Sequence, residues 1–343
     1  MARWKVFLTE PIDGYERMVE NLEKGGCEVS LGPHTREATR EISEEELIRR
    51  AADLDAIMVG TRERITRKIL EAGTRLGTVA KYAIGVERID VKAATELAIL
   101  VSNTPVVENF VGVAEGAVAR ILALAKNLKR CDFNARRIIW KDIVNVLVCG
   151  KTVGIVGLGN IGNRVAELLT PFGVRLLAYD PYANQERAAH LRVELTDLET
   201  LLRESDFVTL HCVTTPETRG FMNEARFRLM KPGAYLINTA RGALVNERDL
   251  NRALREDWIA GAALDVYDPE PPAPDNPLLS PELEFKTQLS PHAAGATPEM
   301  TRRMSAAQVE NCLRALRGEI PEFVVNPPVI PRWRDRLDKS QQT

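Results

Sequence analysis

Three glycines and one acid have the residue types and the spacing of a dinucleotide-binding site. Gly157, Gly159 and Gly162 follow the pattern G-x-G-x-x-G, and Asp180 comes about 20 residues further on. The first glycine would make a tight turn, the second would let backbone N–H groups approach a pyrophosphate, and the third would let a helix pack on a strand. Asp180 would accept hydrogen bonds from the adenine-ribose hydroxyls and repel a 2′-phosphate, which favours NAD over NADP.

The residues around the glycines predict the elements that such a site needs. Val153–Val156 is a β-branched run typical of a buried parallel strand. Val165–Leu169 has helical spacing and stops before Pro171, and Val174–Tyr179 reads as the next strand. The order strand, glycine turn, helix, strand favours a nucleotide site over the alternative, a structural glycine turn that binds nothing.

Length and composition indicate a globular protein of about two domains. The 343 residues are 45% hydrophobic and 27% charged, and the formal net charge of −2 gives no footprint for nucleic acid or an anionic membrane. No stretch predicts a membrane span, and the start "MARWKVFLTEP" has no apolar signal region. The five cysteines are scattered without a C-x-x-C pair, so neither a metal site nor a disulfide framework is expected. A cytoplasmic location is expected instead.

Alternating short apolar runs and helical patterns predict a small parallel α/β domain at the start of the chain. Its helix Ser43–Ala52 begins with a cap-like Ser43. The small-residue run Val111–Leu128 predicts one long helix, and the basic segment after it, to Gly150, is either an arm against another subunit or a solvated loop. The expected strands of this first part are Lys5–Thr9, Ala56–Val59, Thr78–Lys81 and Ile99–Ser102.

The remainder predicts a doubly wound α/β domain. A proline-rich surface loop is expected at Asp268–Leu283, and an amphipathic helix from Pro298 to Leu316 precedes a closing strand or extended tail. The expected strands are Phe207–His211, Tyr235–Asn238, Ile259–Leu264 and Thr287–Leu289, with a helix at Glu247–Glu256.

Together with the segments "INTARGALV", "AALDVYDPEPP" and "SPHAAGAT", these elements resemble the D-isomer-specific 2-hydroxyacid dehydrogenase family, over Val6 to Pro327. The resemblance implies a Rossmann-type doubly wound nucleotide domain at 105–295. It also implies a smaller, discontinuous, flavodoxin-like substrate domain from 1–104 and 296–330, with 331–343 left as a polar tail. A short form without the regulatory domain of long phosphoglycerate dehydrogenases is expected, and a homodimer through the helix and arm of Val111–Gly150.

Three positions match the catalytic set of that family. Arg241 follows an expected strand, where open α/β sheets present ligands, and its fork can hold a carboxylate. His292, one of four histidines, can exchange a proton with a carbonyl oxygen near neutral pH. Glu270 matches the histidine's partner by resemblance, and a carboxylate there would stabilise the protonated imidazole. The alternatives are that Arg241 forms a surface ion pair, that His292 is a core histidine with its hydrogen bonds satisfied, and that Glu270 is an exposed acid in a loop.

The resemblance also implies contacts to the cofactor and the substrate. The turn "AIGVERID" resembles the family's glycine loop, whose backbone N–H groups hold the substrate carboxylate. Arg62 and Arg64 resemble the basic loop that meets the phosphate in phosphoglycerate dehydrogenases, although such a pair is often only solvated. Implied cofactor contacts are Asn160 and Ile161 at the pyrophosphate, Val213 and Pro216 beside the adenosine, Thr239 and Ala240 at the nicotinamide ribose, Asp265 at the carboxamide, and Gly295; implied substrate contacts are Ile84, Gly85, Val86 and Asn109.

The expected function is an NAD-dependent interconversion of a D-2-hydroxyacid and a 2-oxoacid. The substrate pair would be 3-phosphoglycerate and phosphohydroxypyruvate, or one of the glyoxylate and hydroxypyruvate type, and the basic pair favours a second anionic group. One alternative is an NAD(H)-sensing, corepressor-like binding module, which would keep the same residues. Another is oxidation of an oxyanion such as phosphite, which Ile84 disfavours because phosphite dehydrogenases carry lysine there; Glu270 argues against formate, whose dehydrogenases pair their histidine with glutamine.

Overall fold

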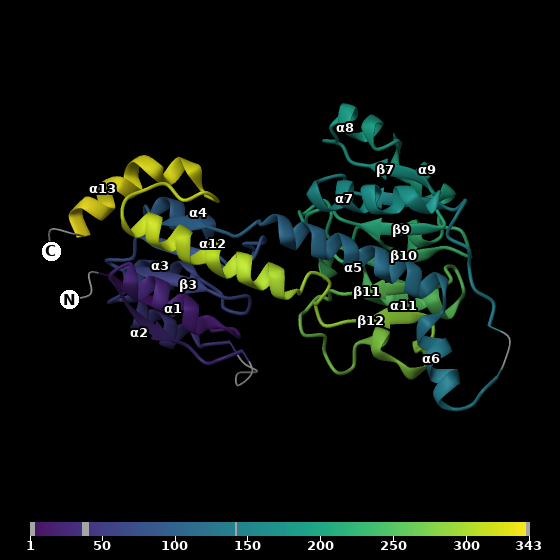
Figure 1. Ribbon diagram of the computed structural model, residues 1–343, viewed down its shortest axis with the longest axis horizontal. Helices are drawn as coiled ribbons and strands as arrows, with labels where there is room; N and C mark the ends of the chain where they lie inside the picture. The colour runs from purple at the N-terminus through teal and green to yellow at the C-terminus, as the bar shows by residue number, and fades with distance from the viewer. Residues whose placement is uncertain (1–3, 36–40, 141–142, 341–343) are drawn as a thin grey trace. The chain divides into compact units, whose positions relative to one another are not determined.

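The computed structural model describes residues 4–35, 41–140 and 143–340. They fold as two compact units, unit 1 from Met1–Val107 with Pro298–Thr343 and unit 2 from Glu108–Thr297 (Figure 1). The α/β class expected from the sequence is confirmed in both. Among the described helices, none is long and apolar enough to cross a membrane.

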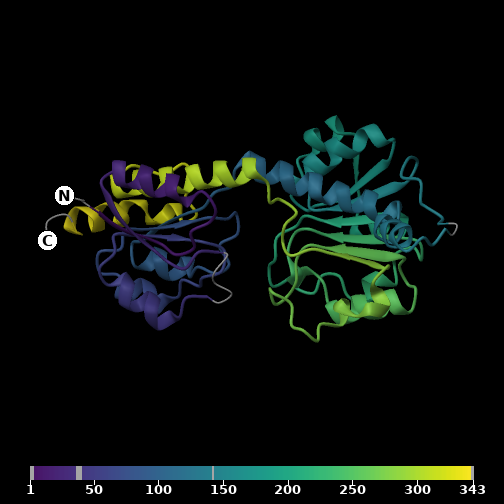
Figure 2. The ribbon, with the colours of Figure 1, turned by 60° about the horizontal axis from the view of Figure 1, so that its bottom comes forward.

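Unit 1 is built on a parallel five-stranded sheet with the flavodoxin-like order β2-β1-β3-β4-β5. Helices α1 (Tyr15–Lys24) and α12 (Pro298–Leu316) pack on one face of this sheet, and α2 (Glu44–Ala51), α3 (Arg67–Ala72) and α4 (Val91–Glu96) on the other (Figure 2). The Ser43 side chain caps α2 by accepting the N–H of Glu46, as expected. The strands are β1 (Trp4–Leu8), β2 (Cys27–Leu31), β3 (Ala56–Val59), β4 (Thr78–Lys81) and β5 (Leu100–Ser102).

The expected polar tail at 331–343 is wrong for its described part, because helix α13 (Ile330–Ser340) closes unit 1. Val329, Trp333 and Leu337 recur every four residues, so they form one apolar stripe. This stripe packs against Leu100, and the Trp333 side chain is fully buried. The last three residues lie outside the described part of the chain.

Unit 2 is a parallel seven-stranded sheet in the order β12-β11-β10-β9-β6-β7-β8, the Rossmann order with one strand added. Helices α5 (Val107–Ala125), α7 (Asn160–Leu169) and α8 (Gln185–His190) pack on one face, and α9 (Leu198–Glu204), α10 (Glu224–Phe227) and α11 (Glu247–Arg255) on the other. The strands are β6 (Thr152–Val156), β7 (Arg175–Tyr179), β8 (Val193–Leu195), β9 (Phe207–Leu210), β10 (Tyr235–Asn238), β11 (Gly261–Leu264) and β12 (Thr287–Leu289).

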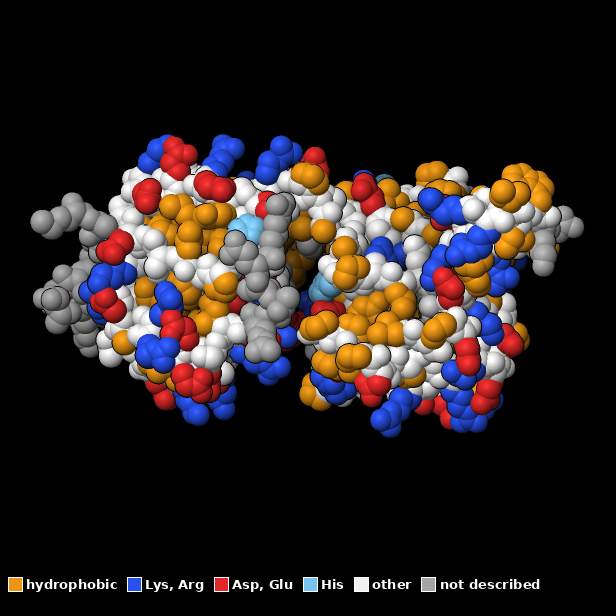
Figure 3. All heavy atoms as spheres, turned by 90° about the horizontal axis from the view of Figure 1, so that it is seen from below, with side chains coloured by type: hydrophobic (Ala, Val, Ile, Leu, Met, Phe, Trp, Pro, Cys, Tyr) orange, Lys and Arg blue, Asp and Glu red, His pale blue; other side chains and the backbone are white. Residues whose placement is uncertain are grey.

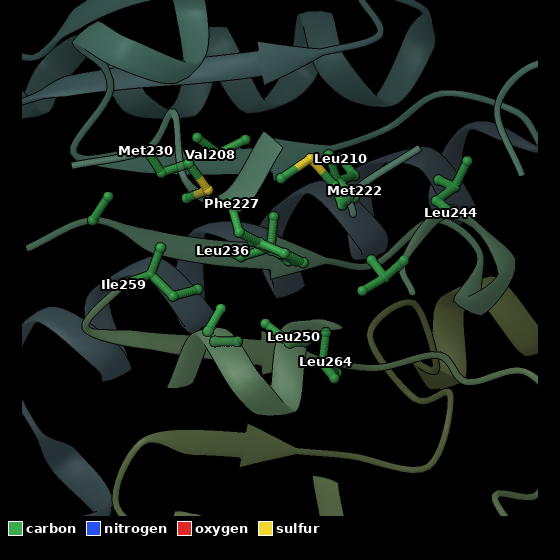
Figure 4. Close-up of a cluster of buried hydrophobic side chains, with 14 of the residues drawn as sticks. Val208, Leu210, Met222, Phe227, Met230, Leu236, Leu244, Leu250, Ile259 and Leu264 are labelled. Carbon is green, nitrogen blue, oxygen red and sulfur yellow. The ribbon is translucent and has the colours of Figure 1, made fainter. Parts of the chain in front are cut away.

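The core of unit 2 holds the strand ends that carry the candidate site. Val208 and Leu236, from neighbouring strands, pack with Phe227 and Leu250 from the helices on one face of the sheet (Figure 4). Each buried side chain of this size contributes about 1.5–3 kcal/mol relative to exposure. Because both faces are covered, the central strands are almost continuously apolar.

Two expectations for the connections need correction. The helix expected at Val111–Leu128 is broken: α5 ends at Ala125, Asn127 adopts a left-handed backbone (φ +46°), and α6 (Leu128–Arg136) follows. After α6 the described residues are irregular up to β6, and residues 141–142 of the expected arm lie outside the described part. The expected closing strand is reduced to a bridge from Val324 to Ser102. Short 3₁₀ turns lie at Thr170–Phe172, Gly242–Leu244, Pro277–Leu279, Pro281–Leu283 and Pro327–Val329.

Candidate active site

The candidate residues of unit 2 follow the carboxyl ends of its strands. All strands of this sheet are parallel, so these ends lie along one edge, and the chain order reverses between β6 and β9. Open α/β sheets bind ligands at such a point. Along this edge lie Gly157 after β6, Asp180 after β7, His211 after β9, Thr239 to Arg241 after β10, Asp265 after β11, and His292 after β12.

Two glycines of the G-x-G-x-x-G motif, Gly157 and Gly162, each have a steric reason to be glycine. Gly157 has φ +94°, which a side chain rarely adopts. A Cβ on Gly162 would lie 2.1 Å from the carbonyl oxygen of Gly157, so α7 approaches the strand closely. A Cβ on Gly159 would meet no described atom within 4 Å. Gly159 directly precedes α7, whose first turn begins with Asn160 and Ile161. This open helix N-terminus fits a pyrophosphate.

The replacement Gly162→Ala tests that close approach. The added methyl group would displace the Gly157 carbonyl, so we expect unfolding to become easier by about 1–3 kcal/mol, as for overpacked sites, and NADH binding to weaken strongly. Urea unfolding and fluorescence titration with NADH measure the two effects. Gly233→Ala is the matched control, since its Cβ would meet no described atom within 4 Å. Equal behaviour of the two variants would contradict the steric role.

Two side chains, Asp180 and Asn163, hold the glycine loop in position. The Asp180 carboxylate accepts the N–H of Leu158 at 2.7 Å, which fixes this acid beside the loop. Asn163, only 4% exposed, donates from Nδ2 to the carbonyls of Leu158 (2.5 Å) and Gly159 (2.7 Å). Asn163 could not be predicted from the sequence, because the glycine pattern leaves that position unrestricted.

The turn after β10 is organised by a buried asparagine, Asn238, which no motif in the sequence predicts. Asn238 accepts the N–H of Ala240 at 3.0 Å and donates to the carbonyl of Arg241 at 2.9 Å. Thr239 is buried, and within the described chain its hydroxyl has no hydrogen-bond partner. A Cβ on Gly242 would lie 2.0 Å from the carbonyl carbon of Tyr267, so the Arg241 turn lies directly against the loop that carries Glu270.

Glu270 and His292 form a hydrogen-bonded pair. His292 Nδ1 lies 2.8 Å from Glu270 Oε2, and the N–H of Tyr267 donates to Glu270 Oε1 at 3.0 Å. The hydrogen bond to Glu270 raises the pKa of His292 above its ordinary value. Burial raises the pKa of Glu270, but the bond to His292 and the positive charges around it outweigh burial and leave that pKa lowered. The charge of Arg241 acts on both groups, so the three residues share one electrostatic environment.

His211, on the same edge, has the opposite character. Burial lowers the pKa of His211 to about 3, and its Nε2 lies 2.9 Å from the Thr209 hydroxyl. A neutral, buried imidazole cannot donate a proton near pH 7. Of the two histidines on this edge, only His292 can therefore serve as an acid.

The remaining cofactor candidates of unit 2 differ in their surroundings. Val213 and Pro216 are exposed on the loop after β9. A Cβ on Gly295 would lie 2.7 Å from the Val113 side chain and 3.6 Å from Asn109 Nδ2, so Gly295 and Asn109 are neighbours. Asp265 is 1% exposed and its carboxylate already accepts several protein donors, which a carboxamide would have to join.

The other substrate candidates belong to unit 1. The loop Ile84–Val86 is half-buried, and its backbone N–H groups have no acceptor within the described residues. Arg62 donates from Nε to Glu10 Oε1 at 2.8 Å, and the Glu10 side chain is 6% exposed. Arg64 is exposed. The ion pair compensates the Arg62 charge on which the hypothesis of a second anionic group depends.

Comparison with known proteins agrees with this geometry. Residues 118–294 match the family described as D-isomer specific 2-hydroxyacid dehydrogenase, NAD binding domain. The chain is 36% identical to a D-3-phosphoglycerate dehydrogenase of Methanocaldococcus jannaschii over 96% of its own length, but spans only 60% of that relative. It is 39% identical to a glyoxylate reductase of Thermococcus kodakarensis, over 96% of this chain and 98% of the relative. A crystal structure from Thermus thermophilus superposes with a TM-score of 0.85 at 32% identity, covering 94% and 99% of the two chains.

The expected cofactor is supported from two sides, since the matched domain is described as NAD-binding and the glycine loop leaves an open helix N-terminus beside an acid. Among the described residues, no cluster of three or more histidine, cysteine or acidic side chains could hold a metal ion. Sequence, fold and site geometry lead to one conclusion: the chain belongs to the D-isomer-specific 2-hydroxyacid dehydrogenase family.

Proposed function

We propose that this protein interconverts a D-2-hydroxyacid and a 2-oxoacid with NAD as the redox partner. The observation that carries the proposal is the hydrogen bond between His292 Nδ1 and Glu270 Oε2, beside the Arg241 turn and on the nucleotide-binding edge. This arrangement supplies a proton donor, its orienting carboxylate and a cation within one electrostatic environment.

Each residue has a defined part in the proposed reaction. With Nδ1–H donated to Glu270, the other ring nitrogen of His292, Nε2, is left to exchange a proton with the oxygen on C2. The Arg241 fork would hold the substrate carboxylate. Bound NAD(H), held by the glycine loop and Asp180, would exchange hydride with C2.

We propose a small 2-oxoacid of the glyoxylate or hydroxypyruvate type as substrate. Arg62 is already paired with the nearly buried Glu10, so its charge is compensated before any substrate phosphate arrives. NADH oxidation with glyoxylate, hydroxypyruvate and 3-phosphohydroxypyruvate tests this choice. Preference for the phosphorylated acid, lost in Arg62→Ala, would overturn it. The absence of turnover with every 2-oxoacid, with NADH still bound, would favour the sensing module instead.

The proposed role of His292 makes reduction of the 2-oxoacid depend on pH in one direction. The protonated imidazole is the acid, and its pKa lies above the ordinary value because of Glu270. Reduction should therefore be fastest below that raised pKa and decline as pH rises through it. In Glu270→Gln the hydrogen bond to a carboxylate is lost, so the decline should move to lower pH and kcat should also fall. A pH profile of kcat/KM with an unchanged limb in Glu270→Gln would contradict the coupling.

We further propose a cytoplasmic homodimer. Large hydrophobic side chains are exposed in the segment after α6, with Ile138 86% and Trp140 90% exposed, and hydrophobic side chains gather on the surface at this end of unit 2 (Figure 3). Such surfaces commonly mark protein interfaces. The cysteines are all free thiols, as suits a reducing compartment. Sedimentation analysis should show a dimer for the native chain and more monomer for Trp140→Glu; a monomeric native chain would contradict the proposal.

A further inference from the structure

Arg120 is a buried cation that the proposed reaction does not use. It lies on α5 and is 8% exposed. Gly112, Gly116 and Arg120 are spaced four residues apart, so they lie along one face of the helix. A Cβ on Gly116 would lie 2.6 Å from the carbonyl oxygen of Ala294, and one on Gly112 would lie 3.1 Å from that of Gly295. This face of α5 therefore lies directly against the segment that follows His292.

The Arg120 guanidinium ends at the buried carboxylate of Asp265. Its Nη2 donates to Asp265 Oδ1 at 2.6 Å and to the Ser290 hydroxyl at 2.5 Å, while Nη1 donates to the carbonyl of Gly116 at 2.8 Å. Ser290 donates in turn to Asp265 Oδ1 at 2.6 Å. A carboxylate that is 1% exposed is stable as an anion only when it is paired and hydrogen-bonded, and Arg120 supplies the charge.

Asp265 binds three consecutive N–H groups of the catalytic segment. The N–H of His292 donates to the Asp265 carbonyl at 2.8 Å, and those of Ala293 and Ala294 donate to its carboxylate oxygens at 3.0 and 2.8 Å. At these hydrogen bonds the backbone of His292 is left-handed, with φ +52°. Non-glycine residues adopt this conformation only when their surroundings hold them there. The His292 ring reaches Glu270 from this conformation.

We propose that Arg120 is a positioning residue that, by neutralising and orienting the Asp265 carboxylate, holds the 292–294 turn in the conformation that presents His292. The expected effect of Arg120 on kcat rests on the proposed function. Its expected effect on the conformation of residues 292–294 does not. Arg120 acts through Asp265 and touches neither reacting group.

The test compares Arg120→Met and Arg120→Lys in the full chain. In Arg120→Met, amide hydrogen exchange in the peptide around 292–294 should accelerate by about tenfold or more, because those N–H groups lose a fixed acceptor. The kcat with the best 2-oxoacid should fall by about 10- to 100-fold, the loss expected for a misplacement of ~1 Å. Arg120→Lys keeps the charge and should recover much of kcat and of the protection.

Controls separate positioning from general damage. Arg175→Met removes another arginine of unit 2, one that pairs with Glu194 and Glu204 at the surface, and should change neither exchange at 292–294 nor kcat. Should Arg120→Met not fold, Arg120→Met/Asp265→Asn removes the buried charge as well, and fast exchange with low kcat is again expected. Native protection with native kcat in the folding variant, or fast exchange with native kcat, would overturn the proposal. A native chain without turnover would contradict the proposed function. The hydrogen-exchange data would still test whether Arg120 fixes the backbone of residues 292–294.

Discussion

Replacing His292 with asparagine is expected to lower kcat for 2-oxoacid reduction by about 10²- to 10⁴-fold, the usual contribution of a positioned acid. Asparagine can keep a hydrogen bond to Glu270, yet it has no proton to give at neutral pH. NADH binding should persist, because the glycine loop and Asp180 hold their positions through contacts that do not include His292. Steady-state kinetics and NADH fluorescence titration measure the two quantities separately.

His190→Asn is the matched control for that substitution. His190 is exposed at the end of α8 and should be replaceable without a change in kcat. Near-native turnover in His292→Asn would contradict the proposed role of His292 as the acid. A loss of turnover equal in both variants would point to general damage instead.

Replacing Arg241 with methionine is the second change with a large expected effect. The fork would hold the substrate carboxylate with two charge-assisted hydrogen bonds of about 1.5–3 kcal/mol each, so kcat/KM should fall by about 10²- to 10⁴-fold. Arg241→Lys keeps the charge but loses the planar fork, so it should recover only a small part. Kinetics with glyoxylate and hydroxypyruvate measure the loss.

Arg248→Met provides the comparison, because Arg248 is exposed on α11, a few residues along the same chain segment. It should leave kcat/KM unchanged. Full activity of Arg241→Lys would show that charge alone is needed and would contradict bidentate binding. A normal kcat/KM in Arg241→Met would exclude the residue from the site.

The sequence predicts most strands of both sheets and misses one edge strand of each. The expected bounds of β3, β4, β10, β12 and α12 match the structure, since a strand or helix buried against neighbours must be apolar in a regular pattern. β2 and β8 were missed; both are edge strands, whose polar residues face solvent and weaken the pattern. Helix α13 was missed because charged residues surround its single apolar stripe.

For the site, the sequence predicts residues that lie in recognisable motifs but not those that hold them through tertiary contacts. Asn163 and Asn238 fix two turns at the carboxyl ends of strands in unit 2 with side-chain amides that no spacing rule singles out. Arg120, on α5, pairs with Asp265, which lies far from it in the sequence. The compensation of Arg62 by Glu10 likewise joins two loops far apart in the chain, so only the folded structure reveals it.

The most direct test of the central claim is isotope transfer. The protein would be incubated with NADH carrying deuterium on both C4 positions and with hydroxypyruvate, and the product would be analysed by mass spectrometry and chiral chromatography. Deuterium on C2 of D-glycerate, formed about 10²- to 10⁴-fold more slowly by His292→Asn, is the result that the proposed mechanism predicts. No labelled hydroxyacid from hydroxypyruvate or any other 2-oxoacid, while NADH binds tightly, would contradict the dehydrogenase and leave a protein that senses the dinucleotide.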